Sequence, residues 1–415
     1  MRKLYNGYID SFRGFSREVW ILALITLINR AGTMVLPFLT KYLKEDIAFS
    51  LEEVGTIMIF FGLGSLAGSW LGGKLTDMIG FYKVMVFSLL VSGFMFLGLQ
   101  YIRTFWGFCI GIFAIMTIAD MFRPAMFVSL NTYARPENRT RALTLIRLAI
   151  NLGFGAGPAL GGLIIVTLGY GGLFWIDGIT CIIAILVFRA LVKEKKAIIS
   201  QEEVELTSKS SVLTDYPFQL FLVISFLMGL VFFQFFTTMP LYHADVYQLT
   251  EFETGLLLAM NGFLIFALEM PLVHHAEKSG FDSIKIYGAS MILLAAGFFI
   301  LIFENSIIFL VISVVLLTVA EMYGFPFGND FAMKRAKAGK AGNYMGAYTM
   351  AFSMAHILTS KTGLFVIDHF GYVANWIFMG SLAIIGFLLA VYLRRILAKE
   401  KLAAKMKVPA ELTKT

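Results

Sequence analysis

Twelve long apolar runs dominate this sequence and leave little choice of fold. A helix that crosses a bilayer needs about 20 mainly apolar residues, and a helix satisfies its own backbone groups where water is absent. Hydrophobic residues make up 58% of the 415 residues and charged residues 15%, and this composition excludes a soluble, disordered or coiled-coil protein. We therefore expect an all-α polytopic membrane protein. The expected spans are 18–42, 51–77, 82–101, 104–133, 140–168, 171–192, 218–244, 250–276, 281–303, 305–333, 342–368 and 372–397.

The longest polar stretch lies near the middle of the chain and divides the spans into six and six. The expected parts are an N-terminal bundle (1–192), a cytoplasmic linker (193–217), a C-terminal bundle (218–397) and a basic tail (398–415). Most of the 34 Lys and Arg residues fall on the side that carries both termini. Because positive loops stay in the cytoplasm, both termini should be cytoplasmic and the chain should lie in the cell membrane. The net charge of +7 then reflects topology, and no nucleic-acid partner is expected.

The two halves resemble each other at a nearly constant offset of 200 or 201 residues. Three pairs of segments match: 50–55 with 250–255, 77–81 with 277–281, and 117–122 with 318–323. The first pair is typical of capping boxes, in which Ser or Thr and a Glu three residues later satisfy free backbone N–H groups. An even number of spans in each half gives parallel repeats, and such repeats enclose a substrate cavity near the middle of the bilayer.

Segments of this chain resemble motifs of a known protein family. The segment 73–83 (GKLTDMIGFYK) resembles GxLxDRxGRR, the signature of the major facilitator superfamily. The matching positions are Gly73, Asp77, Gly80 and Lys83. Met78 and Phe81 stand where basic residues are usual, which weakens the cytoplasmic charge lock that the signature implies. The resemblance implies two pseudo-symmetric six-helix bundles that work by alternating access.

A second segment, 153–162 (GFGAGPALGG), resembles GxxxGPxxGG of the superfamily's proton antiporters and contains Gly157, Pro158 and Gly161. Close helix packing is the simpler explanation of its glycines, because small residues four apart let helices approach. Arg139 resembles the arginine that the superfamily carries in the turn between the fourth and fifth spans.

Seven ionisable residues fall inside the expected spans, where a charge costs at least ~3 kcal/mol. They are Arg30, Asp120, Arg123, Arg147, Glu269, Glu321 and Lys361. Asp120 and Arg123 are three residues apart and can neutralise each other. Glu321 matches Asp120 in the repeat, but Gly324 stands where its cation would be. A carboxylate without a cation should exchange protons near neutral pH, because desolvation disfavours its charged form. We therefore expect Glu321 or Glu269 to carry a coupling proton, with Asp120 as third candidate.

Three arginines, Arg30, Arg123 and Arg147, come from spans that line the central cavity in the superfamily. They form either a cationic pocket for a carboxylate or phosphate, or a fixed network with Asp120 and backbone carbonyls. Gln234, Thr238 and Tyr242 are four residues apart and predict a polar stripe toward the cavity. The other candidate substrate-binding residues are Asn151, Asn261, His356 and Lys361.

The expected function is proton-coupled export of a small amphipathic organic compound by a monomer. The alternative is proton-coupled uptake of an anionic nutrient, peptide or metabolite, and a non-transporting sensor is a third class. An enzyme is not expected, because the spans contain no nucleophile with an orienting base. His274 and His275 are adjacent instead of four residues apart, so they do not form a helical zinc site. No metal and no cofactor is expected.

Overall fold

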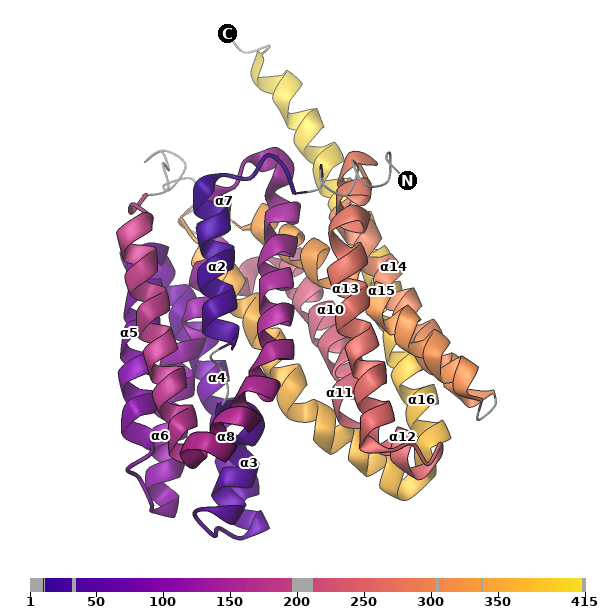
Figure 1. Cartoon of the computed structure of the whole chain (residues 1–415). Coiled ribbons are helices and arrows are strands. Elements are labelled where there is room, and N and C mark those ends of the chain that lie inside the picture. Colours follow the sequence, from indigo (N-terminus) through magenta and orange to yellow (C-terminus); the bar gives the residue numbers. More distant parts are fainter. Residues whose placement is uncertain are drawn as a thin grey trace.

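The computed structural model describes residue 10 and residues 12–31, 35–195, 212–303, 306–336 and 339–412, apart from some side chains inside helices. Within these ranges the chain forms helices joined by short turns, and it contains no strand. Figure 1 shows two groups of helices side by side, the first from the N-terminal half and the second from the C-terminal half. The start of α2 and the end of α16 lie at the same end of the molecule, which we call the terminal side.

The N-terminal half contains the first six expected spans. Its helices are α2 (Arg17–Ala31), α3 (Val35–Glu45), α4 (Leu51–Ile79), α5 (Phe81–Leu99), α6 (Phe105–Asp120), α7 (Phe122–Tyr133) and α8 (Arg139–Leu191). The short 3-10 helix η1 (Pro136–Asn138) precedes α8. The helices α2 and α3 form the first span and α6 and α7 the fourth, whereas α8 holds the fifth and sixth spans.

The C-terminal half repeats this plan. Its helices are η2 (Val212–Thr214), α10 (Tyr216–Phe232), α11 (Gln234–Thr237), α12 (Met239–Asp245), α13 (Glu251–Lys278), α14 (Ser283–Phe299), η3 (Ile300–Ile302), α15 (Ile307–Arg335) and α16 (Ala341–Leu412). The helices α10 to α12 form the seventh span, and α16 holds the eleventh and twelfth.

Capping residues and glycines explain where several of the expected helices begin and end. Ser50 and Thr250 each accept a hydrogen bond from the backbone N–H three residues on, and both predicted capping boxes are confirmed. The break between the fifth and sixth spans falls at Gly169, with φ 71°, and the break between the last two at Gly371, with φ 82°. Glycine adopts positive φ without steric strain, which explains why these helices turn there.

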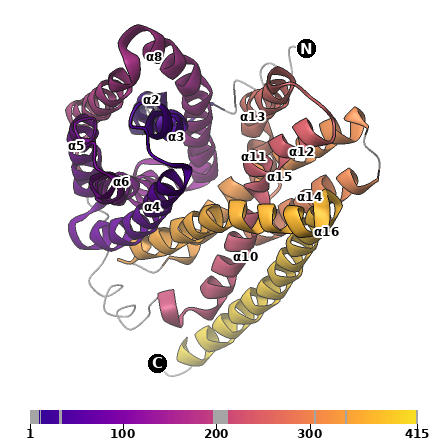
Figure 2. The same ribbon diagram turned by 90° about the horizontal axis from the view of Figure 1, so that it is seen from below.

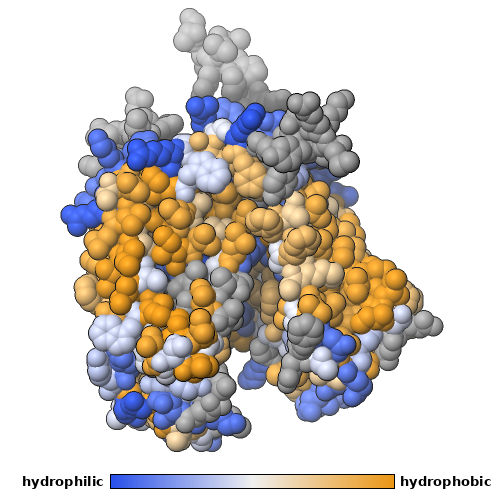
Figure 3. Space-filling model, in the orientation of Figure 1, coloured by the Kyte–Doolittle hydropathy of each residue, from blue (hydrophilic) through white to orange (hydrophobic). Residues whose placement is uncertain are grey.

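Nine helices in the described part of the chain are long and apolar enough to cross a membrane. This number is smaller than the twelve expected spans because α2 and α3 are each short, while α8 and α16 each combine two spans. On the face that Figure 3 shows, a broad hydrophobic band lies between hydrophilic residues at the two ends of the molecule. This surface is that of a multi-pass membrane protein.

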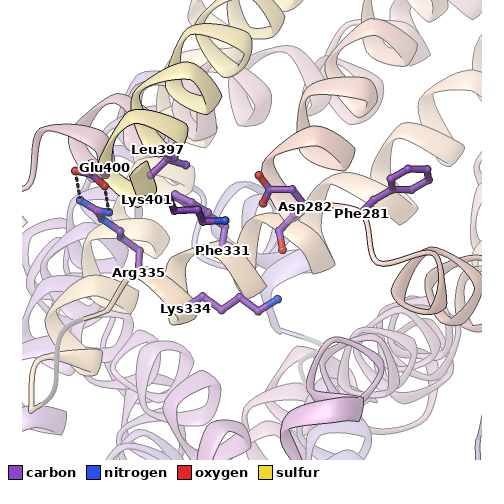
Figure 4. A pocket seen from close by; sticks show the side chains of 9 residues that line it. Phe281, Asp282, Phe331, Lys334, Arg335, Leu397, Glu400 and Lys401 are labelled. Carbon is purple, nitrogen blue, oxygen red and sulfur yellow. Dashed lines mark hydrogen bonds and ion pairs between the residues drawn. The ribbon is translucent and has the colours of Figure 1, made fainter. Parts of the chain in front are cut away.

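The basic tail expected from residue 398 starts as a continuation of the last helix, because α16 continues to Leu412. Residues 394–402 are mostly Arg, Lys, Leu, Ala and Glu, which favour helix. The extension is held by Arg335 at the end of α15, whose Nη1 lies 2.6 Å from Oε2 of Glu400. Figure 4 shows this pair beside a cavity of about 380 Å³ on the terminal side of the C-terminal half.

Arg335 also fixes the start of the seventh span. Its Nη2 lies 2.7 Å from Oδ1 of Asp215, and the hydroxyl of Tyr344 donates to Oδ2 of Asp215 at 2.8 Å. Burial raises the pKa of Asp215, but the hydrogen bonds from Arg335 and Tyr344 outweigh it and hold that pKa below its ordinary value. The ionised form of Asp215 therefore stabilises the fold.

Replacing Arg335 with glutamine should lower the free energy of unfolding by about 1.5–3 kcal/mol at neutral pH, because buried Asp215 loses charged hydrogen bonds. A group with a lowered pKa stabilises the fold above the ordinary aspartate value of about 3.9, and this contribution is lost as pH falls through the folded-state pKa. Thermal unfolding in detergent should therefore show a difference between variant and wild type that shrinks on acidification.

The matched control is Glu400→Gln, which removes only the second partner of Arg335. The Glu400 side chain is 43% exposed, and such surface pairs contribute less than about 1 kcal/mol. An equal effect of the two substitutions would contradict the role given to Asp215.

Candidate functional site

The two halves meet along α4 with α16 and along α8 with α13. Figure 2 views the molecule from the side opposite the termini and shows α4 and α16 running between the two groups of helices. Figure 3 shows the molecule hollowed between the halves on that same side, which we call the open side. The structure is therefore closed at the terminal side and open at the other.

Arg147 of α8 is the central charged residue of this interface. Its Nε lies 2.8 Å from Oε1 of Glu269 on α13, and its Nη2 lies 3.1 Å from Oε1 of Glu321 on α15. The Glu269 side chain is fully buried, and those of Arg147 and Glu321 are 16% and 8% exposed. One arginine of the N-terminal half thus holds two carboxylates of the C-terminal half.

This arrangement corrects the expectation that Glu321 lacks a cation. As the repeat indicates, no cation lies three residues after Glu321 on α15. The partner of Glu321 is Arg147, which lies 174 residues away in the sequence and in the other half. Asn261, expected to bind substrate, instead donates to Oε2 of Glu321 at 3.1 Å and to Thr318 at 2.9 Å. The guanidinium carbon of Arg147 lies 4.7 Å from the ring centre of Phe325.

The two carboxylates differ in their free oxygen. Both oxygens of Glu321 accept hydrogen bonds, one from Arg147 and one from Asn261. Oε2 of Glu269 is buried and has no hydrogen-bond partner among the described residues. A proton can therefore join Glu269 at Oε2 without displacing a donor, whereas a proton on Glu321 at Oε2 would displace the amide of Asn261.

A second charged group lies in the N-terminal half, within a cavity of about 460 Å³. Oδ1 of Asp120 lies 3.2 Å from Nε of Arg123, so the predicted pair at this spacing is present. Arg30 and His356 line the same cavity, and the ring of His356 packs edge-on against Phe233 with 4.9 Å between the centres.

A smaller cavity of about 190 Å³ adjoins the first, and Arg30, Arg123, Phe233 and Phe352 line both. Arg147 also lines the smaller cavity. The three arginines therefore line two cavities that have four lining residues in common. Ser65 of α4 and Ser353 of α16 line the larger cavity and lie 3.2 Å apart across the halves.

The three residues of the expected polar stripe on the seventh span bond and pack inside the C-terminal half. Gln234 donates to the backbone oxygen of Thr359 at 3.1 Å, and Thr238 donates to Gln234 at 2.7 Å. Tyr242 lies in the apolar core of the C-terminal half, against Trp376. All three are buried and line neither of the two cavities, because this face of the helix packs inside its own bundle.

Two further candidates lie away from the site. Lys361 is exposed and lines neither cavity, because the buried residues of α16 next to it, Thr359 and Gly363, lie on another face of the helix. Asn151 is half-buried on α8 and also lines neither cavity. The side chains of 154–159, which include Gly157 and Pro158, lie outside the described residues, and Gly161 is buried.

The signature segment closes the terminal side. Asp77 accepts hydrogen bonds from the backbone N–H groups of Gly342 at 2.6 Å and Asn343 at 2.8 Å, at the start of α16. A carboxylate is favoured at a helix N-terminus. Because Asp77 binds backbone groups, this contact does not need basic residues at positions 78 and 81.

The other residues of the signature segment, and Arg139, also lie on the terminal side. Gly80 ends α4 with φ 90°, Lys83 is exposed, and Arg139 begins α8 half-buried. Gly73 touches the backbone of α16, where a Cβ would lie 2.5 Å from the backbone oxygen of Gly342.

Sequence reasoning missed the counterpart of Asp77 in the second half. Glu277, at the end of α13, accepts from the backbone N–H of Arg141 at 3.2 Å and from its guanidinium Nε at 3.0 Å. Arg141 lies in the first turn of α8, so both contacts join a carboxylate at a helix end to the start of a helix in the other half. The matching of 77–81 with 277–281 was the signal that could have found this contact.

The sequence profile of the Major Facilitator Superfamily matches residues 22–360. The chain belongs to this superfamily. Among curated relatives, the uncharacterized MFS-type transporter YttB of Bacillus subtilis is 24% identical over 361 residues, covering 86% of this chain and 89% of that protein. The Na(+), Li(+), K(+)/H(+) antiporter of Planococcus maritimus is 21% identical over 86% of this chain and 91% of its own.

A solved structure, the human organic anion transporter MFSD10, superimposes with a TM-score of 0.73 at 16% identity over 90% of this chain and all of the other. At this identity the likeness shows the fold alone. The superfamily assignment makes the protein a membrane transporter of small solutes, and the alternative of a membrane-embedded enzyme is set aside.

Proposed function

We propose that the protein is a proton-coupled antiporter of the plasma membrane that exports a small amphipathic organic compound by alternating access as a monomer. Its termini face the cytoplasm, in keeping with the concentration of Lys and Arg residues on the terminal side. A curated relative is named as an Na(+), Li(+), K(+)/H(+) antiporter, which supports proton antiport. In this orientation the open side faces outward and the terminal side is closed.

One observation carries the proposal: buried Arg147 is shared by Glu269 and Glu321 across the two halves. Taking up a proton removes the charge of one carboxylate and weakens its attraction to Arg147. The halves can then separate at the terminal side. The unused Oε2 of Glu269 makes Glu269 the first candidate for the proton, ahead of Glu321. Asp120 is a third candidate, already neutralised within its own half by Arg123.

The coupling can be tested without knowing the solute. Spin labels at Thr104 and Ile307, which are exposed on the open side of opposite halves, report how far the halves are separated there. The native cysteines, Cys109 and Cys181, are buried. Lowering the pH from about 8 to about 5 should shift the label-to-label distances from longer to shorter, because protonation releases the terminal side and the open side closes.

Glu269→Gln should resemble the acid state at every pH and lose this response, because glutamine is a neutral copy of the protonated side chain. Glu321→Gln should lose part of it. Glu400→Gln serves as the carboxylate control, because Glu400 pairs with Arg335 within the C-terminal half. If Glu269→Gln and Glu321→Gln both keep the full pH response, neither residue carries the coupling proton.

The second candidate function is proton-coupled uptake of an anionic solute, favoured by the three arginines that line the two adjoining cavities. The direction of proton movement separates the two modes. When a transported solute is added to proteoliposomes with an imposed pH gradient, export by antiport and uptake by symport should change the internal pH in opposite directions.

A further inference from the structure

A long apolar groove lies on the surface of the molecule, where α4, α10 and α16 meet at the terminal side. Its volume is about 700 Å³, and we call it the terminal groove. Trp70 of α4, Val223 of α10 and Met354 of α16 line it and are 52%, 49% and 44% exposed. Among the described residues, it shares no lining residue with the two cavities between the halves. Because its exposed residues are apolar and lie in membrane spans, the groove faces acyl chains.

The depth of the terminal groove matches one leaflet of a bilayer. Along α16 its lining extends from Asn343 to Met354, a rise of about 16 Å at 1.5 Å per residue. The hydrocarbon core of a bilayer is about 30 Å thick, so that one leaflet contributes about 15 Å. Along the seventh span the lining extends from Val212 in η2 to Phe226 in α10. The groove therefore runs from the terminal surface to about the middle of the membrane, which suits one acyl chain.

Two lysines lie at the terminal end of this groove. Lys340 precedes α16 and lines the groove. Lys74 follows Gly73 on α4, and Gly73 touches the backbone of Gly342, so Lys74 lies at the same level of the membrane as the start of α16. The ammonium of Lys74 lies 5.5 Å from the ring centre of Trp70, which itself lines the groove.

The charge at this end of the groove is positive. No aspartate or glutamate is among the described residues that line it. Lys340 interacts with Asp77, whereas Lys74 is exposed and forms no ion pair with any described residue. The groove thus combines an apolar wall that is one leaflet deep with cations at its terminal end, and these features complement an anionic phospholipid.

The groove depends on the closed terminal side. Trp70 and Lys74 belong to the N-terminal half, whereas α10 and α16 belong to the C-terminal half. Gly346 lines the groove and also packs against α4, where a Cβ would lie 2.9 Å from Cα of Gly73. Separation of the halves at the terminal side would move Trp70 and Lys74 away from α10 and α16. A ligand with higher affinity for one conformation shifts the equilibrium toward that conformation.

We propose that the terminal groove binds one anionic phospholipid of the leaflet on the terminal side, with its phosphate at Lys74 and Lys340 and an acyl chain against Trp70, Phe226 and Met354. The bound lipid stabilises the conformation that is closed at the terminal side. This inference goes beyond the proposed function, because it concerns a site outside the transport cavities and a ligand that is not transported.

The binding test compares phosphatidylglycerol, which carries a net negative charge, with phosphatidylcholine of the same acyl chains, which is neutral overall. The purified full-length protein in detergent is titrated with each lipid, and the bound lipid is counted by native mass spectrometry. Phosphatidylglycerol should bind at least about fivefold more tightly, since each lysine near an anionic lipid contributes about 1 kcal/mol, or about fivefold. Lys74→Gln should weaken phosphatidylglycerol binding by about this factor and leave phosphatidylcholine binding unchanged.

Lys285→Gln is the matched control and should leave the binding of both lipids unchanged. Lys285 is also exposed, and its ammonium lies 4.1 Å from the ring centre of Phe281, but it does not line the groove. Ala347→Phe tests the apolar wall, because Ala347 is half-buried and lines the groove. The added ring should take the place of the acyl chain and weaken both lipids by about tenfold, the factor expected when about two CH₂ groups lose their burial. Lys74→Gln changes only an exposed side chain, so it keeps the test decisive if Ala347→Phe folds poorly.

The labels at Thr104 and Ile307 report the conformational effect. When part of the phosphatidylcholine in a bilayer is replaced by phosphatidylglycerol at constant pH, the fraction of longer label-to-label distances should rise. Lys74→Gln should remove this rise, and Lys285→Gln should keep it. Protons drawn to the anionic surface cannot imitate the effect, because acid is expected to shorten these distances.

The proposal is overturned if phosphatidylglycerol binds no better than phosphatidylcholine, if Lys74→Gln and Lys285→Gln weaken its binding equally, or if Ala347→Phe folds and binds it at full strength. A dimer that Ala347→Phe abolishes would place a second copy of the chain in the groove and would also overturn it. Lipid binding without any change in the label-to-label distances would overturn the conformational effect. Failure of proton coupling is a separate result, because lipid binding that depends on Lys74 stands even if the labels do not respond to pH.

Discussion

Replacing Arg147 with glutamine should lower the free energy of unfolding by about 3–5 kcal/mol, because it leaves two buried carboxylates without their cation. Glu269 and Glu321 both lie within 3.1 Å of this guanidinium. The same variant should lose the pH response of the label-to-label distances, since the contact that protons release is already absent. Thermal unfolding in detergent and the spin-label measurement check the two effects independently.

The triple variant Arg147→Gln, Glu269→Gln, Glu321→Gln should recover most of the stability, because no uncompensated charge remains buried. It should not recover the pH response. Arg103→Gln serves as the surface control, because Arg103 pairs with Asp46 through a side chain that is 63% exposed. If Arg147→Gln is as stable as the wild type, the two carboxylates do not depend on Arg147 and the coupling mechanism loses its basis.

Replacing Gly73 with alanine should prevent the terminal side from closing as it does in this structure. An alanine Cβ would lie 2.5 Å from the backbone oxygen of Gly342 and 2.9 Å from Cα of Gly346. Both obstacles are backbone, so no side chain can rotate away, and overpacking of this kind costs about 1–3 kcal/mol. The labels at Thr104 and Ile307 should therefore move closer together at every pH.

The matched control is Gly55→Ala in the same helix, where a Cβ would meet no atom within 4 Å. Alanine favours helix more than glycine does, so a loss of the closed state in Gly73→Ala alone must come from the steric contact. Unchanged label distances in that variant would show that the halves are not held together at this crossing.

The spans and the capping boxes could be predicted because each depends on neighbours in the sequence. Ser50 and Glu53, for example, satisfy each other's backbone within one turn. The partner of Glu321 could not be predicted in this way. Arg147 reaches it from the other half, and only the packing of the two bundles brings them together.

Spacing along a helix predicts which residues share a face, but not what that face meets. Gln234, Thr238 and Tyr242 share a polar stripe by spacing, yet this stripe bonds within the C-terminal half. For the three arginines, the superfamily resemblance supplied the missing information, namely which spans line the cavity. Orientation about the helix axis is the quantity that a single sequence leaves undetermined.

The breaks at Gly169 and Gly371 affect how this protein can be recognised from the open side. At each of these two breaks, one span follows the other with a single non-helical residue between them. These connections therefore offer antibodies almost no loop to contact. A flat paratope would make few contacts at either turn, whereas the long third loop of a nanobody can insert into a concave epitope. Binders selected against this face should therefore reach into the hollow and arrest the transporter in the state described.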